Sequence, residues 1–126
     1  TPIIVLAAGS RNLDLVKLLI ENGARPDDKS RDETTALTLA AANGDVEIVA
    51  YLLDNKADID EPGSLRETAL IKAARARQIE TVALLVARGA DTEETDSAGA
   101  TALDIAERNH QPQIVALLKK KKEDAK

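Results

Sequence analysis

The sequence repeats itself at a constant offset of 33 residues. Threonine recurs at positions 35, 68 and 101, and valine recurs at positions 16, 49, 82 and 115. A fixed period of this length indicates a stacked array of similar supersecondary units rather than one closed globule. Stacked arrays expose long continuous surfaces, so the period favours a module that binds other proteins.

Residues 35–64 indicate what one unit folds into. Thr35 is suited to cap a short helix, and Gly44 supplies the left-handed residue that ends it. Asp45 then caps a second helix over 46–53, which is apolar at helical spacing. Residues 56–64 have the composition of a turn. The pattern predicts an all-α protein built from helix pairs.

Composition restricts both the core and the setting of the chain. Apolar residues make up 44% of it but Tyr51 is the only aromatic, so Ala, Leu, Ile and Val must build closely packed helix layers. Without cysteine, disulfides and thiolate metal sites are excluded.

No apolar run approaches the roughly 18 residues of a membrane span. No signal peptide is present, so we expect a cytoplasmic protein without a membrane partner. Because the chain begins at Thr1 rather than Met, a removed leader and a repeat before Thr1 stay open.

The chain is acidic apart from a short basic tail. Of its 17 basic and 22 acidic residues, residues 119–126 hold five lysines and two acids. The remainder therefore carries 12 basic and 20 acidic residues, a net charge of −8. Nucleic acid needs a basic footprint, so we expect no nucleic-acid partner.

The residues of catalytic and metal sites are missing. His110 is the only histidine and stands at a helix-capping position, and there is no Gly-rich phosphate loop. The acids at 58–60 and 93–96 lack the alternating ladder, central Gly and terminal Glu of a calcium loop. We therefore predict no enzyme activity, cofactor or metal.

The repeated unit resembles the ankyrin repeat. Residues 35–41, 68–74 and 101–107 stand at the family's Thr-Pro-Leu-His-x-Ala-Ala motif, and residues 88–91 keep its Gly-Ala-Asp ending. The resemblance implies a solenoid of antiparallel helix pairs joined by β-hairpin-like loops. It implies one domain over 1–126, with repeats at approximately 1–29, 30–62, 63–95 and 96–122 and a charged tail at 119–126.

The chain departs from that family pattern at its helix ends. The motif's His is replaced in every unit, by Val5, Thr38, Ile71 and Asp104. The Gly that ends the short helix is kept only at Gly44, and a second capping Gly is replaced by Lys56; the other replacements are Arg11, Arg77 and His110. A non-Gly residue held at positive φ costs on the order of 1 kcal/mol, so we expect a sound fold of less than the family's best stability.

The two ends of the array differ in polarity. Glu107 and Lys119 place charge where earlier units have apolar residues, which is how a terminal unit stays soluble. Ile3, Ile4 and Leu6 show no such polar cap. Either a unit precedes them or the first layer is partly open.

The resemblance implies that a partner lies against the loop tips and the inward face of the short helices. Leu65 is the one bulky apolar residue at a tip, either an anchor for a partner or packed onto Pro62. The positions of this chain that match on the tips are Arg31, Asp32, Thr34, Ser64, Leu65, Glu67, Ser97 and Ala100, and those on the short helices are Asn43, Arg75, Arg108 and Asn109.

Charge refines the expected partner. Acids concentrate in the three long loops, whereas the loops that join short to long helices carry Arg11, Arg75, Arg77, Arg108 and His110. An acidic ridge along the tips predicts a protein partner that presents a basic segment. We expect a monomeric adaptor, scaffold or inhibitor. The alternative is an engineered or purely structural repeat scaffold without a dedicated ligand, which the lack of Cys, Met, Phe and Trp favours.

Overall fold

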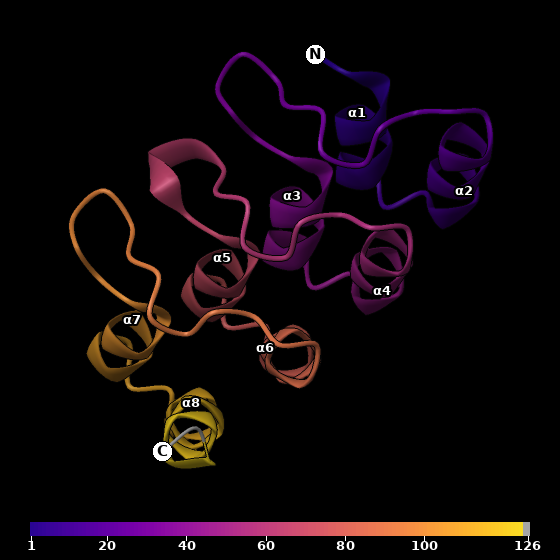
Figure 1. Cartoon of the computed structure of the whole chain (residues 1–126). Helices are drawn as coiled ribbons and strands as arrows, with labels where there is room; N and C mark the ends of the chain where they lie inside the picture. Colours follow the sequence, from indigo (N-terminus) through magenta and orange to yellow (C-terminus); the bar gives the residue numbers. More distant parts are fainter. Residues whose placement is uncertain (125–126) are drawn as a thin grey trace.

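The computed structural model describes residues 1–124, with no account of the side chains of Lys122 and Asp124. Its helices pair in chain order into four layers, each a short helix followed by a longer or equal one (Figure 1). The helices are α1 Ile3–Gly9, α2 Leu13–Glu21, α3 Ala36–Asn43, α4 Val46–Asp54, α5 Ala69–Arg75, α6 Ile79–Ala87, α7 Ala102–Arg108 and α8 Pro112–Asp124, with a 3-10 turn η1 at Ser64–Arg66. No strand occurs among these residues, so the predicted all-α solenoid of helix pairs is confirmed.

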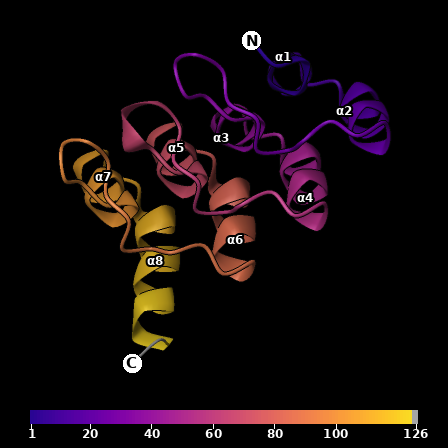
Figure 2. The same cartoon turned by 45° about the horizontal axis from the view of Figure 1, so that its top comes forward.

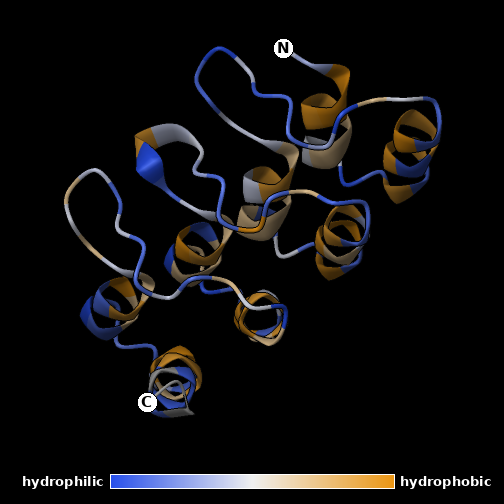
Figure 3. Ribbon diagram, in the orientation of Figure 1, coloured by the Kyte–Doolittle hydropathy of each residue, from blue (hydrophilic) through white to orange (hydrophobic). Residues whose placement is uncertain are grey.

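The helices form two rows, and long loops project beside one of them. Helices α1, α3, α5 and α7 make an inner row, and α2, α4, α6 and α8 make an outer row (Figure 2). We call residues 22–35, 55–68 and 88–101 the first, second and third loops. Each loop closes on itself like a hairpin through one backbone bond, such as Asp96 N–H to Ala100 C=O at 3.0 Å. Hydrophilic colours predominate in the first loop and recur in the other two, whereas most of the apolar colour lies on the helices (Figure 3), whose apolar residues form one core.

Threonines begin three of the short helices as expected. The hydroxyls of Thr35, Thr68 and Thr101 accept the backbone N–H three residues ahead, at 3.0, 3.3 and 3.1 Å. These bonds satisfy donors that have no partner within the helix. The repeated threonine therefore fixes where each short helix starts and keeps the loops in register.

Left-handed residues recur at three equivalent positions of the array, one of them in all four repeats and the other two in three repeats each. Gly44 has φ 70°, and its equivalents Arg11, Arg77 and His110 have φ 59°, 64° and 56°, as predicted. Lys56, with φ 73°, is the predicted equivalent of Gly23 and Gly89. The third position was not predicted and holds Glu33, Arg66 and Gly99. The backbone thus needs the same turn in each repeat whether or not glycine supplies it.

The core is one continuous layer of small side chains. Alanine pairs at positions 7–8, 40–41 and 73–74 are buried and let neighbouring short helices approach closely. Val16, Val49 and Val82 fill the equivalent place beneath the outer row. Tyr51 lies half-buried against this core, so the prediction of a core residue holds only in part.

The ends of the array differ as the sequence indicates. Ile3, Leu6 and Leu18 are exposed, so the first layer is partly open. Glu107 and Lys119 are exposed on the last repeat. None of the described helices is long and apolar enough to cross a membrane.

Candidate functional site: the inner surface

The candidate site is the surface formed by the three loops and the inner row of helices. Most of the predicted partner residues lie exposed or half-buried on it. Two do not: the side chain of Glu67 is 3% exposed and that of Ala100 is 2% exposed. Both are covered because they stand at the base of their loops, where the closing backbone bonds form. This corrects the expectation of direct contact for these two residues.

A groove of about 420 Å³ opens between α1 and the first loop. Its floor is apolar, from Val5 and Leu39, and Arg31 and Asp32 stand on its rim. Thr34, also predicted, lines the same groove, together with Thr1 and Ser30. The structure therefore brings three predicted residues together around an apolar floor, the arrangement typical of a recognition groove.

Hydrogen bonds hold the rim of this groove. The hydroxyl of Ser30 donates to the Asp32 carboxylate, which also accepts the Thr34 backbone N–H at 3.2 Å. These bonds, that of Ser30 first, lower the pKa of Asp32 below the ordinary carboxyl value. Asp32 is thus ionised at neutral pH and its loop is held in place before any partner arrives.

Leu65 projects from the tip of the second loop. Its side chain is 70% exposed, so the alternative that it packs onto Pro62 is wrong. Its backbone is left-handed, with φ 57°, and its carbonyl accepts the Ser97 N–H at 2.9 Å, which ties the second tip to the third. An exposed leucine on a strained but anchored backbone is suited to insert into a partner.

An ion network beneath the second and third loops neutralises part of the expected acidic ridge. Glu67 binds Lys72 at 2.9 Å and Arg75 at 2.6 Å, and Arg75 reaches Asp96 at 3.0 Å. Arg75, the last residue of α5, therefore lies between two acids rather than on a basic edge. Glu67 and Asp96 are neutralised there, so the predicted acidic ridge is interrupted at these two residues.

Asp96 is the most firmly held member of this network. It accepts the backbone N–H groups of Ala98 and Ala100, both at 2.9 Å. The bond from Ala100, followed by that from Ala98 and the charges of Arg75 and Arg108, lowers the pKa of Asp96 in spite of its burial. The third loop is thus shaped by a carboxylate and does not offer that carboxylate to a partner.

Other charged residues connect one repeat to the next. Asp27 accepts the Asp58 backbone N–H at 3.0 Å, and Asp60 accepts that of Asp91 at 2.8 Å. At the opposite edge, Arg11 donates to the Asn43 carbonyl at 2.8 Å and Gln78 to the Ala42 carbonyl at 3.1 Å. These side chains hydrogen-bond to the backbone of the neighbouring repeat, so they are less available to a partner.

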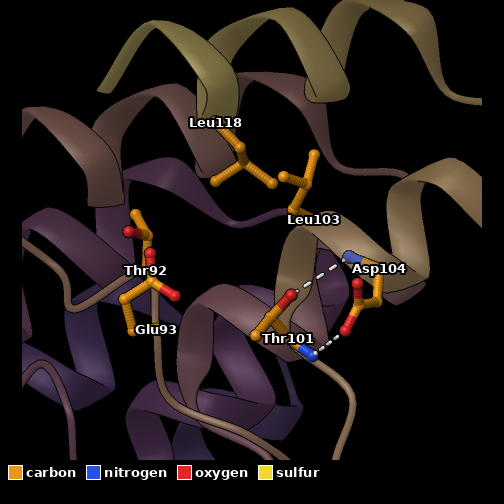
Figure 4. A pocket seen from close by; sticks show the side chains of 6 residues that line it. All are labelled: Thr92, Glu93, Thr101, Leu103, Asp104 and Leu118. Atoms are coloured by element: carbon orange, nitrogen blue, oxygen red, sulfur yellow. Dashed lines mark hydrogen bonds between the residues drawn. The ribbon is translucent and has the colours of Figure 1, made fainter. Parts of the chain in front are cut away.

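A second cavity, of about 140 Å³, lies in the last repeat (Figure 4). Thr101 and Asp104 on its wall are engaged in capping α7, through bonds of 3.0 and 3.1 Å (Figure 4). Leu103 and Leu118 close its apolar side (Figure 4). Its volume is below the roughly 300 Å³ of small ligand pockets, so it is not a candidate site.

Sequence reasoning missed the floor of the main groove. Val5 was noted only as the replacement of a family histidine, and Leu39 was not singled out. The residue type of Val5 did not mark it as a groove residue, because Ile71 is also apolar at the equivalent position, where only Thr38 and Asp104 are polar. Leu39 resembles a core residue in the sequence, so its place on the groove floor was missed. Its partial exposure depends on how far the first loop stands from α1.

The geometry agrees with the comparison with known families. The family model for ankyrin repeats (three copies) matches residues 1–63 and 60–126. The chain belongs to the ankyrin repeat family. Repeats of this family are generally protein–protein interaction modules and typically not enzymes. No curated protein matches the chain significantly.

Proposed function

We propose that this chain is an adaptor, scaffold or inhibitor module that binds an extended segment of a partner protein along its inner surface. The segment runs from the groove over Val5 and Leu39 toward the tip at Leu65. The observation that carries the proposal is the exposure of Leu65 on a backbone held by Ser97, together with the groove at the first loop and its ordered rim. Apolar anchors beside fixed polar groups are what hot spots require.

The proposed partner segment carries basic residues. Asp32 is ionised on the groove rim, and Asp28, Glu33 and Asp58 are exposed on the same side of the molecule. The chain as a whole is acidic, at −5. Long-range attraction of this kind raises the association rate and weakens with salt. The proposal takes the module as a cytoplasmic monomer.

The test compares two exposed leucines. Leu65→Asp removes the proposed anchor, and Leu18→Asp changes a leucine that is 55% exposed on the outer row. Aspartate tolerates the left-handed backbone of residue 65 better than leucine does, so the first variant keeps its fold. Both variants and the wild type are immobilised, and bound proteins from the native lysate are quantified.

A protein retained by the wild type and by Leu18→Asp, but lost with Leu65→Asp, supports the inner-surface site. Its association rate should also fall when salt rises from about 0.05 to 0.3 M, because the Debye length shortens. Equal retention by all three chains would contradict the site. No protein above background would favour the structural scaffold without a ligand.

A further inference from the structure

Two grooves on the outer row occupy the same place in different repeats. One, of about 320 Å³, lies between α2 and α4, and the other, of about 470 Å³, lies between α6 and α8. The first is lined by Leu13, Lys17, Glu47, Ala50, Tyr51 and Asp54. The second is lined by Ile79, Glu80, Ala83, Gln113, Ala116, Leu117 and Lys120. Most members of one set match the other at twice the repeat offset, so the pair is an internal comparison.

The floor is covered in the first groove and open in the second. The Lys17 ammonium lies 5.7 Å from the centre of the Tyr51 ring, so its stem and the ring span the space between α2 and α4. The equivalent residues are Ala83 and Leu117, which are too short to meet across the space. Ile79, 37% exposed, adds to the apolar floor. Helices α6 and α8 stand side by side (Figure 2).

The charge of the rim also differs. Glu47 and Asp54 flank the first groove, whereas Gln113 and Lys120 hold the equivalent positions in the second. Glu80 is the acid that lines the second groove, at its other end from Lys120 along the sequence of the two helices. Lys119 is exposed beside Lys120, and Lys121 follows on the same last turns of α8. This end of the groove is basic on a chain whose remainder is acidic.

We propose that the α6–α8 groove binds an amphipathic helix of another protein, with apolar residues on one face and carboxylates at one end. Two neighbouring helices form a channel that a third helix fills with residues spaced by three and four. The lysines at the end of α8 then pair with the carboxylates. This site is independent of the inner surface and selects a partner of the opposite charge. A flat anionic bilayer fits a concave groove less well, and the acidic remainder of the chain repels it.

The probes are two fluorescein-labelled 16-residue peptides with leucines at helical spacing. One carries glutamates in its last two turns, and the other carries them in its first two turns. Fluorescence anisotropy measures binding to the whole chain. We expect one of the two peptides to bind, and its lysine counterpart to bind at least about tenfold more weakly because like charges meet at the α8 end.

Three double variants test the site. Ala83→Lys with Leu117→Tyr rebuilds the covered floor of the first groove and should weaken binding at least tenfold. Lys119→Glu with Lys120→Glu should weaken it by a similar factor and reduce its dependence on salt. Lys17→Ala with Tyr51→Leu is the matched control and should leave the affinity within about twofold, since it acts on the other groove. Circular dichroism verifies that each variant is folded.

The proposal is overturned if neither glutamate peptide binds, or if the rebuilt floor binds them as well as the wild type. It is also overturned if phosphatidylserine vesicles retain the chain through Lys119 and Lys120 while the peptides do not, because the surface would then be a membrane contact. None of these results bears on Leu65 and the inner surface.

Discussion

The second and third repeats have the same fold but are held together differently. In the second, Gly44 ends α3 and the Asp45 carboxylate caps α4, accepting the Ile48 N–H at 3.3 Å. In the third, Arg77 takes the left-handed turn and Gln78 provides no side-chain cap for α6. Gln78 instead reaches back to the previous repeat. The second repeat thus relies on local backbone signals, and the third on ties to its neighbours.

The difference teaches how a repeat tolerates poor local sequence. The third repeat has the buried network of Glu67, Lys72 and Arg75, which links its loop, its helix and the loop that follows. These ion pairs compensate for the missing glycine and the missing helix cap at the turn between α5 and α6. They also make the third repeat depend on the repeats on either side, as the nearest-neighbour energetics of stacked arrays require.

Removing Glu67 should produce the largest loss. Glu67→Ala leaves the partly buried ammonium of Lys72 without this partner and breaks the tie between Arg75 and the base of the second loop, so we expect the unfolding free energy measured in urea to fall by about 2 kcal/mol. The control is Arg88→Ala, which breaks the exposed pair between Arg88 and Asp54 and should cost less than about 0.5 kcal/mol. Equal losses in the two variants would show that the network adds nothing.

Hydrogen exchange should resolve the two repeats directly. We expect amides of α3 and α4 to exchange about tenfold more slowly than those of α5 and α6, a difference of about 1.4 kcal/mol in local opening. Both repeats are internal, so fraying at the ends does not decide the result. Uniform protection measured by mass spectrometry would contradict the comparison.

Thr81 is a defect specific to the third repeat. Its buried hydroxyl has no hydrogen-bond partner among the residues that the structure describes, and the equivalent residues Ile48 and Ile114 are apolar. Thr81→Val should raise unfolding free energy by about 1 kcal/mol, because it removes an unsatisfied polar group at nearly constant volume. Thr38→Val is the control and should destabilise, since the Thr38 hydroxyl is bonded to Thr35. A loss in both would mean that the Thr81 hydroxyl does find a partner in solution.

The left-handed turn offers a smaller gain. Arg77→Gly should stabilise by roughly 0.5–1 kcal/mol because glycine has no Cβ to strain at φ 64°. The reverse change, Gly44→Ala, should destabilise, because its Cβ would stand 2.3 Å from the Gln78 side-chain oxygen. Thermal melts of the two variants measure both signs. No gain at residue 77 would indicate that contacts of the arginine offset the strain.

Acid should weaken the third loop. The folded pKa of Asp96 lies below the ordinary 3.8, so its stabilising effect is complete above that value and is lost as pH falls through the lowered pKa. Urea unfolding between about pH 7 and pH 2.5 should show that Asp96→Asn flattens this acid limb. An unchanged slope in the variant would show that other carboxylates govern acid unfolding.

Individual residues show which features of the fold and the candidate site could be predicted from the sequence. Thr35, Gly44 and the left-handed Arg77 and His110 were read from the period, because capping and φ depend on a few neighbouring atoms. The repeat boundaries stay a prediction. Burial of Glu67 and Ala100, exposure of Leu65 and the groove over Val5 were not read, because each depends on the distance between a loop and a helix of another repeat.

The sequence by itself determined the stack: its period, its helix pairs and its alanine-rich layers. These follow from local chemistry repeated in register. Only the tertiary structure decided which charges remain available to a partner. Arg75 and Asp96 come from different repeats and neutralise each other across the loop, whereas Lys17 covers one outer groove and Ala83 leaves its equivalent open. Such pairings depend on side-chain reach between repeats, which spacing along the chain does not encode.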